Sequence, residues 1–318
     1  MLLMILGHVG IPKSLDMFIH AFHMPIFFLF SGMFYREMPL RERLRKRFAT
    51  LLRPYILWGG IAFAIWWGLH RFCGYDSGNS TFSRLKHLAV TNTTGLPIAG
   101  ALWFLTALFF CEIISSVILK KLKYKPYLWT MGAALLCLIL GALGGSFLKG
   151  RTPWAIAQGM VSVFFYCSGY IMESKKLLQR HISLAWISFG ILAWVGLIFL
   201  NGSVNLRSSN FGFLPLFVLN AVLGGYFLLY IGKQMEGQPR LQVSRIWKYI
   251  TGIGANSMAY VVTNQIVLVL WQHVSELISG GGKIIQYKPV LFLLTLVSIF
   301  AIDRIIRGKI RRIMFGRS

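Results

Sequence analysis

Three histidines lie near the start of the chain in apolar surroundings. His8 follows the apolar run MLLMILG, and His20 and His23 are three residues apart, which places them on one face of a helix. Imidazole is the side chain that can be neutral inside a membrane and still exchange a proton near pH 7. A neutral His8 could therefore act as a general base, taking the proton from a hydroxyl group whose oxygen attacks a thioester carbonyl. We expect His23 to line the same cavity.

The residues that follow His23 suggest how this region packs. No charged side chain occurs from His23 to Tyr35. Pro25 frees a backbone carbonyl and predicts a kink, and Ser31-Gly32 offers a small notch where another helix can approach closely. Packing is a better explanation of Ser31 than a role as acyl-carrying nucleophile. The histidines have an alternative explanation too, as packing residues bonded to a carbonyl or a hydroxyl group.

The densest basic stretch of the chain runs from Arg41 to Arg47 and continues to Arg53-Pro54-Tyr55. Arginine binds phosphate with bidentate geometry, so Arg47 and Arg53 are candidates to bind the phosphates of an acyl-CoA donor. The alternative is that this charge only sets the orientation of the chain in the membrane.

Further polar candidates lie within apolar segments. Glu112 is an acidic residue inside an apolar segment, which indicates a function and a histidine or arginine partner. Trp103 suits an interfacial anchor or a substrate contact. Asn264 and its neighbour Gln265 could bind a sugar or hold helices together. We predict Trp103, Glu112 and Asn264 as substrate-binding residues.

No metal site is expected from the sequence. The four cysteines have no CxxC spacing, so they indicate neither a zinc site nor a disulfide framework.

The composition indicates which elements must position these residues. The chain has 318 residues, of which 56% are hydrophobic and 13% charged, whereas soluble domains carry about 25% charged residues. We therefore predict an all-α, polytopic integral membrane protein, with residues 1–318 forming a single domain of about ten transmembrane helices. The expected segments are Met1–Gly10, Ser14–Tyr35, Thr50–Phe72, Ile98–Leu119, Tyr127–Leu148, Pro153–Met172, Ile182–Leu200, Phe211–Ile231, Ile253–Val274 and Val290–Ile306.

The first expected segment is short. Ten residues at ~1.5 Å each reach about half of a ~30 Å hydrocarbon core. Either this helix begins upstream of Met1, or its neighbours complete it.

The basic residues predict the orientation. The chain has 33 basic and nine acidic residues, a net charge of +24. Of the basic residues, 24 follow the even-numbered segments and nine follow the odd-numbered ones. The positive-inside rule then places both termini and the Arg36–Arg53 loop in the cytoplasm. This clustering between apolar segments fits a membrane protein better than a nucleic-acid-binding one, so we expect the lipid bilayer as a partner and no nucleic acid.

Five stretches in order resemble the membrane-bound acyltransferase-3 family, and most closely its sugar O-acetyltransferases of the fucose 4-O-acetylase type. They are Gly7-His8, Phe22-His23-Met24-Pro25, Lys46-Arg47-Phe48 with Arg53-Pro54-Tyr55, Leu102–Leu105, and Gly254-Ala255-Asn256-Ser257.

The resemblance implies transfer of an acyl group, usually acetyl from acetyl-CoA, to a carbohydrate hydroxyl at the inner membrane, with His8 as the essential histidine. The chain departs from the family in three ways. The basic residue that usually lies one helix upstream of that histidine is absent, Asn264 stands where the late helix often has a histidine, and only a basic tail follows the tenth segment.

The rival function is export of a polysaccharide or a lipid-linked sugar. Ion-coupled transporters generally need several intramembrane carboxylates, and this sequence offers one, Glu112. We therefore favour the enzyme, with an inactive membrane scaffold as a third alternative. The sequence leaves the acceptor sugar, the acyl chain and the oligomeric state open.

Overall fold

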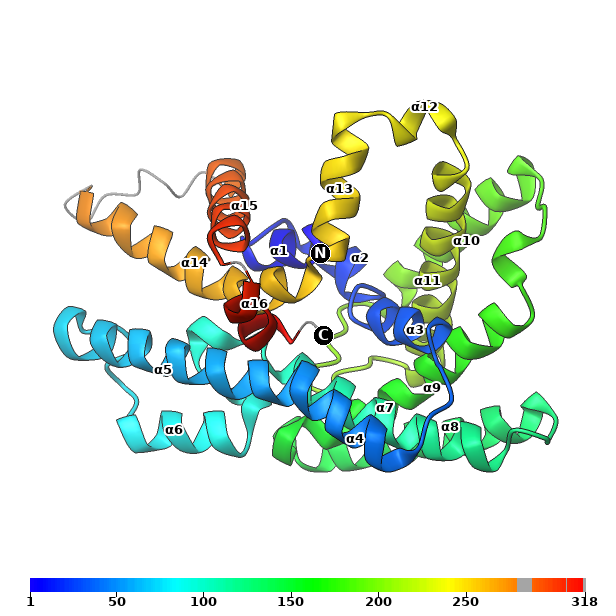
Figure 1. The fold of residues 1–318 in the computed structure, drawn as a ribbon, viewed down its shortest axis with the longest axis horizontal. Helices are drawn as coiled ribbons and strands as arrows, with labels where there is room; N and C mark the ends of the chain where they lie inside the picture. The colour runs from blue at the N-terminus through cyan, green and yellow to red at the C-terminus, as the bar shows by residue number, and fades with distance from the viewer. Residues whose placement is uncertain (279–287, 307, 317–318) are drawn as a thin grey trace.

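The computed structural model describes residues 1–278, 288–306 and 308–316, and this part of the chain is almost entirely helical (Figure 1). Its one β-bridge joins Asn205 and Asn210 in the loop after α10. The all-α prediction is thus confirmed. The first and last described residues both lie near the middle of the view in Figure 1.

Among the described residues, eight helices have 18 residues or more. They are α5 (Arg53–Cys73), α7 (Trp103–Lys121), α8 (Tyr127–Phe147), α9 (Ile156–Ser174), α10 (Leu184–Asn201), α11 (Leu214–Glu236), α14 (Ser257–Ile278) and α15 (Lys288–Ile305). The shorter ones are α1 (Leu2–His8), α2 (Lys13–His20), α3 (Pro25–Met33), α4 (Leu40–Arg47), α6 (Thr81–Ala89), α12 (Pro239–Gln242), α13 (Arg245–Ala255) and α16 (Gly308–Phe315).

Seven helical stretches of the described residues are long and apolar enough to cross a membrane, and an eighth is formed if α13 and α14, bent by 87°, count as one broken span. The seven are Lys13–Met33, Leu40–Cys73, Trp103–Lys121, Tyr127–Phe147, Pro153–Ser174, Leu184–Asn201 and Leu214–Glu236. The first expected segment contains only the seven-residue α1, and the tenth contains α15. The count of ten and the cytoplasmic termini stay predictions; Lys283, Arg307 and the terminal Arg317-Ser318 lie outside the described residues.

Pro25 interrupts the second expected segment. Helix α2 ends at His20, and α3 begins at Pro25 after a four-residue turn. Proline has no N–H to donate and suits the first position of a helix, so the regular helix is interrupted by a turn at the residue where a kink is predicted. The N–H groups of His23 and Ile26 still donate to the carbonyls four residues earlier, so α2 and α3 remain parts of one helical stretch, Lys13–Met33, and His23 lies in the turn between them.

Helices α3 and α9 pack with their backbones in close contact. A Cβ atom at Gly32 would overlap the carbonyl of Tyr166, and one at Gly169 would overlap the carbonyl of Leu29. The pairing runs in opposite directions along the two helices, so they are antiparallel. The notch predicted at Ser31-Gly32 is therefore occupied by α9, while the Ser31 hydroxyl donates to the carbonyl of Phe27, as expected of a packing residue.

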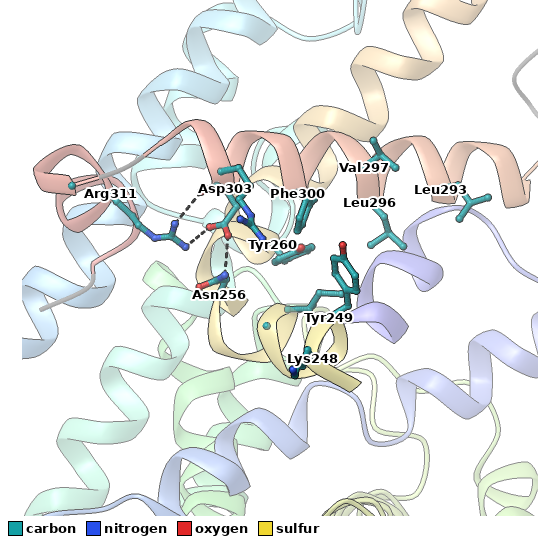
Figure 2. A pocket seen from close by; sticks show the side chains of 14 residues that line it. Lys248, Tyr249, Asn256, Tyr260, Leu293, Leu296, Val297, Phe300, Asp303 and Arg311 are labelled. Atoms are coloured by element: carbon teal, nitrogen blue, oxygen red, sulfur yellow. Dashed lines mark hydrogen bonds and ion pairs between the residues drawn. The ribbon is translucent and has the colours of Figure 1, made fainter. Parts of the chain in front are cut away.

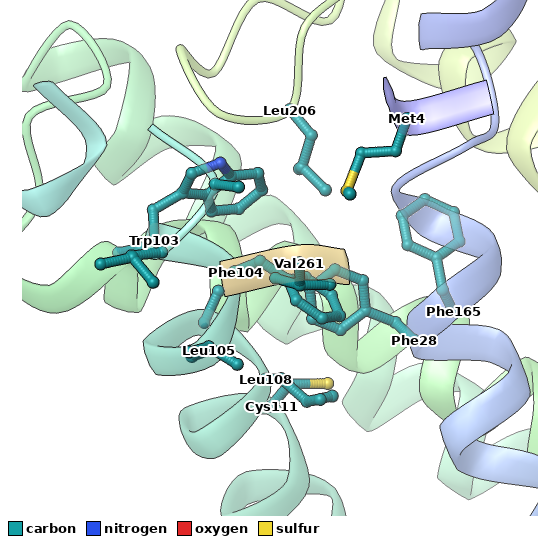
Figure 3. Close-up of a cluster of buried hydrophobic side chains, with 14 of the residues drawn as sticks. Met4, Phe28, Trp103, Phe104, Leu105, Leu108, Cys111, Phe165, Leu206 and Val261 are labelled. Carbon is teal, nitrogen blue, oxygen red and sulfur yellow. The ribbon is translucent and has the colours of Figure 1, made fainter. Parts of the chain in front are cut away.

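Hydrophobic side chains from several helices pack together in the core of the bundle (Figure 3). The rings of Phe28 and Phe104 lie 5.2 Å apart between centroids. Met4 from α1, Val261 from α14 and Leu206 from the loop after α10 are buried beside them. The core thus brings together segments from both ends of the sequence and fixes the residues next to them.

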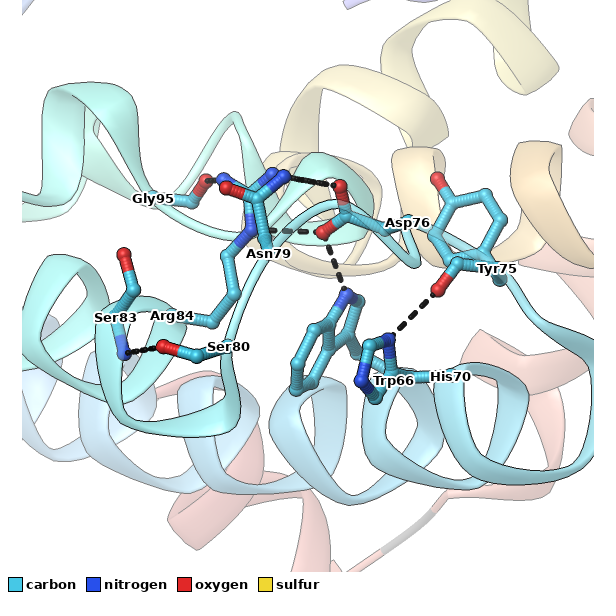
Figure 4. Close-up of polar contacts among 9 residues, drawn as sticks. All are labelled: Trp66, His70, Tyr75, Asp76, Asn79, Ser80, Ser83, Arg84 and Gly95. Carbon is cyan, nitrogen blue, oxygen red and sulfur yellow. Dashed lines mark hydrogen bonds and ion pairs between the residues drawn. The ribbon is translucent and has the colours of Figure 1, made fainter.

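A polar network ties the loop after α5 to the bundle (Figure 4). The carboxylate of Asp76 accepts hydrogen bonds from Arg84 at 2.7 and 2.8 Å, from Trp66 at 3.0 Å and from Asn79 at 2.8 Å. Burial opposes ionisation of this group, but the hydrogen bonds from Arg84, Trp66 and Asn79 outweigh it and lower the pKa of Asp76. The loop between α5 and α6 is therefore held in place by side-chain hydrogen bonds.

Candidate active site

A pocket of about 200 Å³ contains the three histidines singled out from the sequence. His8 comes from the end of α1, His20 from the end of α2 and His23 from the turn before α3. The structure thus places His8 and His23 around one cavity. The remaining lining residues are Met4, Met24, Gly100, Ala101, Trp103, Phe104, Asn205, Leu206, Arg207, Val261 and Gln265.

His23 is held in one orientation. Its Nδ1 lies 2.8 Å from the carbonyl oxygen of Ile19, which can only accept a hydrogen bond. Nδ1 must therefore carry the proton, and Nε2 keeps its lone pair. The ring also contacts that of His20, edge to face, with 4.7 Å between centroids. His20 in turn lies 3.0 Å from the carbonyl oxygen of Asp16.

His8 is positioned by α14. The side-chain nitrogen of Gln265 lies 3.2 Å from Nδ1 of His8 and 3.4 Å from Nε2. An amide nitrogen can only donate, so it hydrogen-bonds whichever ring nitrogen carries no proton and is compatible with either neutral tautomer of the imidazole. The contact orients the ring.

Arg207 reaches the pocket from the loop between α10 and α11. Its Nε donates to the carbonyl of Thr93 at 2.6 Å, and its own carbonyl accepts from the buried amide of Gln158 at 3.0 Å. Within the described part of the chain, no carboxylate forms an ion pair with it, and burial lowers the pKa of its guanidinium. A largely buried cation without a counter-ion favours the approach of negative charge.

Gly100 has no side chain, which leaves room beside His8 for the guanidinium of Arg207 and the side-chain amide of Gln265. A Cβ atom at this position would lie 2.6 Å from Nη1 of Arg207 and 2.6 Å from Oε1 of Gln265. That oxygen is buried and accepts no hydrogen bond from the described residues. A buried acceptor without a donor is costly, so it suits a ligand that donates a hydrogen bond, such as a hydroxyl group.

Of the predicted substrate-binding residues, Trp103 lines this pocket and Asn264 does not. Trp103 is buried, with 3% exposure, so its interpretation as a lipid-facing anchor is wrong. Asn264 donates to the carbonyls of Tyr260 and Val261 in its own helix. Its neighbour Gln265 is the amide that faces the histidines.

Glu112 lies deeper in the bundle and has the arginine partner expected of it. It forms an ion pair with Arg47 and lies 4.0 Å from Arg43. Glu112 is nine residues after Trp103 on α7, which corresponds to about 14 Å along the helix axis. The Glu112 ion pair is therefore separate from the histidine pocket.

Arg53, the other predicted phosphate ligand, contacts the C-terminal helix. Its Nη2 donates to the carbonyl of Arg312 at 2.9 Å. The structure thus gives Arg47 and Arg53 different partners and does not bring them together in one pocket.

A larger pocket, of about 970 Å³, lies between α13 and α15 and contains no histidine or cysteine (Figure 2). Its carboxylate, Asp303, is engaged by Arg311 at 2.6 Å and by Asn256 at 2.8 Å. Size alone therefore does not identify the site. No group of three His, Cys, Asp or Glu side chains in the described residues is arranged to hold a metal ion.

Arg207 is the pocket residue that reasoning from the sequence missed, because it was counted only as a loop charge. One signal was available: it is the single basic residue between Arg180 and Lys233. An isolated cation in a polar loop does not set orientation, so another role could have been suspected.

Comparison with known proteins gives one match. The family model of an acyltransferase domain, acyltransferase family 3, matches residues 1–304. No curated protein and no solved structure matches the chain.

Proposed function

Because the chain belongs to acyltransferase family 3, we propose that it is an integral membrane O-acyltransferase of the inner membrane. It transfers an acyl group, acetyl in the simplest case, from acyl-CoA to a hydroxyl of a cell-surface or exported carbohydrate. The observation that carries this proposal is the pocket in which His8 lies beside Gln265, Arg207 and His23.

The reaction needs one group that accepts and returns a proton. The acceptor's hydroxyl oxygen forms a bond to the thioester carbonyl carbon while the imidazole of His8 takes its proton. The carbon–sulfur bond then breaks, its electron pair stays on sulfur, and the CoA thiolate receives the proton from the imidazolium. The products are an ester and free CoA, and His8 returns to its neutral form.

Arg207 and Gln265 have complementary tasks in this scheme. Negative charge develops on the carbonyl oxygen as the bond to carbon forms, and preorganised donors stabilise it best. Arg207 is fixed through Nε, so its remaining N–H groups can meet that oxygen. The unpaired Oε1 of Gln265 accepts a hydrogen bond from a sugar hydroxyl and holds the acceptor near His8.

Binding of donor phosphates by Arg47 and Arg53 remains a hypothesis. Both guanidinium groups have protein partners, Glu112 and the carbonyl of Arg312. A phosphate would have to replace these partners or share them. Arg36 and Lys176, at the same predicted cytoplasmic side, form no ion pair with another described residue and would not carry this cost.

Export of a sugar polymer is less well supported. An ion-coupled exporter would need carboxylates free to exchange cations. The buried carboxylates of Glu112 and Asp303 are each paired with an arginine, Arg47 and Arg311. No feature of the residues that the structure describes favours the exporter over the enzyme.

The test uses the purified protein in lipid nanodiscs. With acetyl-CoA and the polysaccharide of the producing cell, free CoA should appear only when both substrates and the protein are present. Mass spectrometry of surface polysaccharide, with and without the gene, should show loss of acetyl groups. Unchanged acetylation together with altered export of the polymer would favour the exporter.

A further inference from the structure

Three pockets of the structure follow one another through shared residues. The histidine pocket and an apolar pocket of about 250 Å³ have Met4 and His23 in common. The apolar pocket shares Phe30, Leu228 and Leu229 with a third pocket of about 700 Å³. The three pockets therefore follow one another along α3, from His23 before its first residue to Arg36 after its last, and we call this row of pockets the path.

The wall of this path is formed by one face of α3 and one face of α11. Ile26, Phe27, Phe30 and Phe34 recur at helical spacing on the α3 side. The distance from Ile26 to Phe34 is about 12 Å along the helix axis. The path therefore follows α3 over a stretch of sequence without charged residues, and Phe30 and Phe34 toward its far end are exposed at the surface.

The third pocket has a different character from the second. Arg36, Lys176 and Lys233 line it together with Trp247, and all three basic residues belong to loops or helix ends predicted to be cytoplasmic. Two acids, Glu173 and Glu236, also line it, and Glu236 lies 3.3 Å from Lys233. Arg36 and Lys176 form no ion pair with another described residue.

We propose that this path is the acyl-CoA site, in which the phosphates bind near Arg36 and Lys176, the pantetheine arm follows the apolar pocket, and the thioester reaches His23. The inference rests on the proposed function. CoA has its anionic, aromatic nucleotide at one end and its thiol at the end of a long, flexible arm. The path offers matching surroundings in the same order: first the basic pocket with Trp247, then the apolar pocket, then His23.

The proposal gives the two histidines different positions in one reaction. His23 belongs to both the apolar pocket and the histidine pocket, where the thioester would arrive. His8 belongs to the histidine pocket together with Arg207 and Gln265, where the carbohydrate hydroxyl would bind. Donor and acceptor thus enter from opposite ends and meet between the two imidazoles.

The first test narrows the path. A Cβ atom at Gly232, which lines the third pocket, meets no atom within 4 Å, so Gly232→Leu should fold and fill the pocket. Gly196 on α10 is equally unobstructed and does not line the path, so Gly196→Leu is the matched control. Binding of CoA to protein in nanodiscs should weaken about tenfold or more in Gly232→Leu and stay unchanged in Gly196→Leu. Equal binding by both variants would overturn the proposal.

The second test identifies the phosphates and does not depend on a buried substitution. Lys176 is exposed, so Lys176→Gln should leave the fold intact. Lys176→Gln and Arg36→Gln should each raise the KM for acetyl-CoA roughly threefold to tenfold and leave that for acetyl-pantetheine, which lacks the nucleotide, unchanged. If Arg47→Gln shows this difference while Lys176→Gln and Arg36→Gln do not, the phosphates bind elsewhere and the path is wrong.

Failure of the path and failure of the proposed function give different results. CoA binding is measured without turnover, so it can be followed in His8→Ala protein as well. A chain that does not bind CoA at all contradicts the acyltransferase proposal. A chain that binds CoA equally well when the path is filled or its charges are removed contradicts only the path.

Discussion

The side-chain amide of Gln265 lies 3.2 Å from Nδ1 of His8, although 257 positions separate the two residues in the chain. The contact joins α14 to α1 and sets the orientation of the imidazole proposed as general base. The pocket whose three histidines come from the start of the chain is therefore completed by α14, a helix from the last quarter of the sequence.

Replacing Gln265 tests this positioning. Gln265→Leu should lower kcat about tenfold or more, because the ring loses its partner and the acceptor hydroxyl loses a hydrogen bond. The KM for acyl-CoA should change little, since the amide does not contact the donor path. The adjacent Asn264→Leu is the control, and its kcat should stay within about twofold of wild type. Equal losses in both variants would assign the effect of Gln265 to packing.

The ion pairs of Glu112 with Arg43 and Arg47 make a prediction about stability. Glu112→Met leaves the buried guanidinium of Arg43 without its carboxylate, so it should cost about 3–5 kcal/mol. Arg47→Met should cost less, because the Arg47 side chain is 28% exposed and Glu112 keeps Arg43 at 4.0 Å. Thermal unfolding in nanodiscs compares the two variants. If Arg47→Met unfolds like the wild type but has a higher KM for acyl-CoA, Arg47 is a phosphate ligand instead.

Because the backbones of α3 and α9 are in close contact, adding a single methyl group at the contact should destabilise the protein. Gly32→Ala and Gly169→Ala place a methyl group against a backbone carbonyl and should destabilise the protein by about 1–3 kcal/mol or more. Gly68→Ala on α5 meets no atom within 4 Å and should be neutral. Yield and thermal unfolding after extraction compare the three. A stable Gly32→Ala protein would contradict the close packing.

Asp76 predicts a dependence of stability on pH. Its pKa is lower in the folded state, because the hydrogen bonds from Arg84, Trp66 and Asn79 outweigh burial. A carboxylate whose pKa is lowered by folding stabilises the folded state at pH values above its ordinary pKa of about 4. This stabilisation is lost as the pH falls through the lowered pKa. Thermal unfolding of Asp76→Asn should therefore depend less on pH below about 4 than that of the wild type. Glu37 is the comparison: Lys123 lowers its pKa too, but the pair is exposed and screened by solvent, so Glu37→Gln should flatten the pH dependence less. Flattening as large as that of Asp76→Asn would refute this role of Asp76.

Much of the membrane fold could be predicted from apolar length and small residues. The turn before Pro25 and the notch at Gly32 are local properties of a short stretch, and both occur where expected. Three of the ten expected segments are not among the seven clear spans of the described residues: the first holds only the seven-residue α1, the ninth is α14, which is bent by 87° from α13, and the tenth holds α15.

The site could be predicted only in part. Successive residues of a helix point about 100° apart, so the sequence could not tell whether Asn264 or Gln265 faces the pocket. The position of Arg207 in the pocket depends on hydrogen bonds from its loop to Thr93 and Gln158, which are more than 45 positions away in the sequence. Contacts over such separations follow from tertiary packing, which leaves no local pattern.

The most direct test of the account is acyl transfer by purified His8→Ala protein, measured beside its thermal unfolding. A general base predicts a loss of roughly a hundredfold or more in kcat, with an unchanged unfolding temperature and CoA binding as in the wild type. Transfer at near wild-type rate by a folded His8→Ala protein would contradict the account.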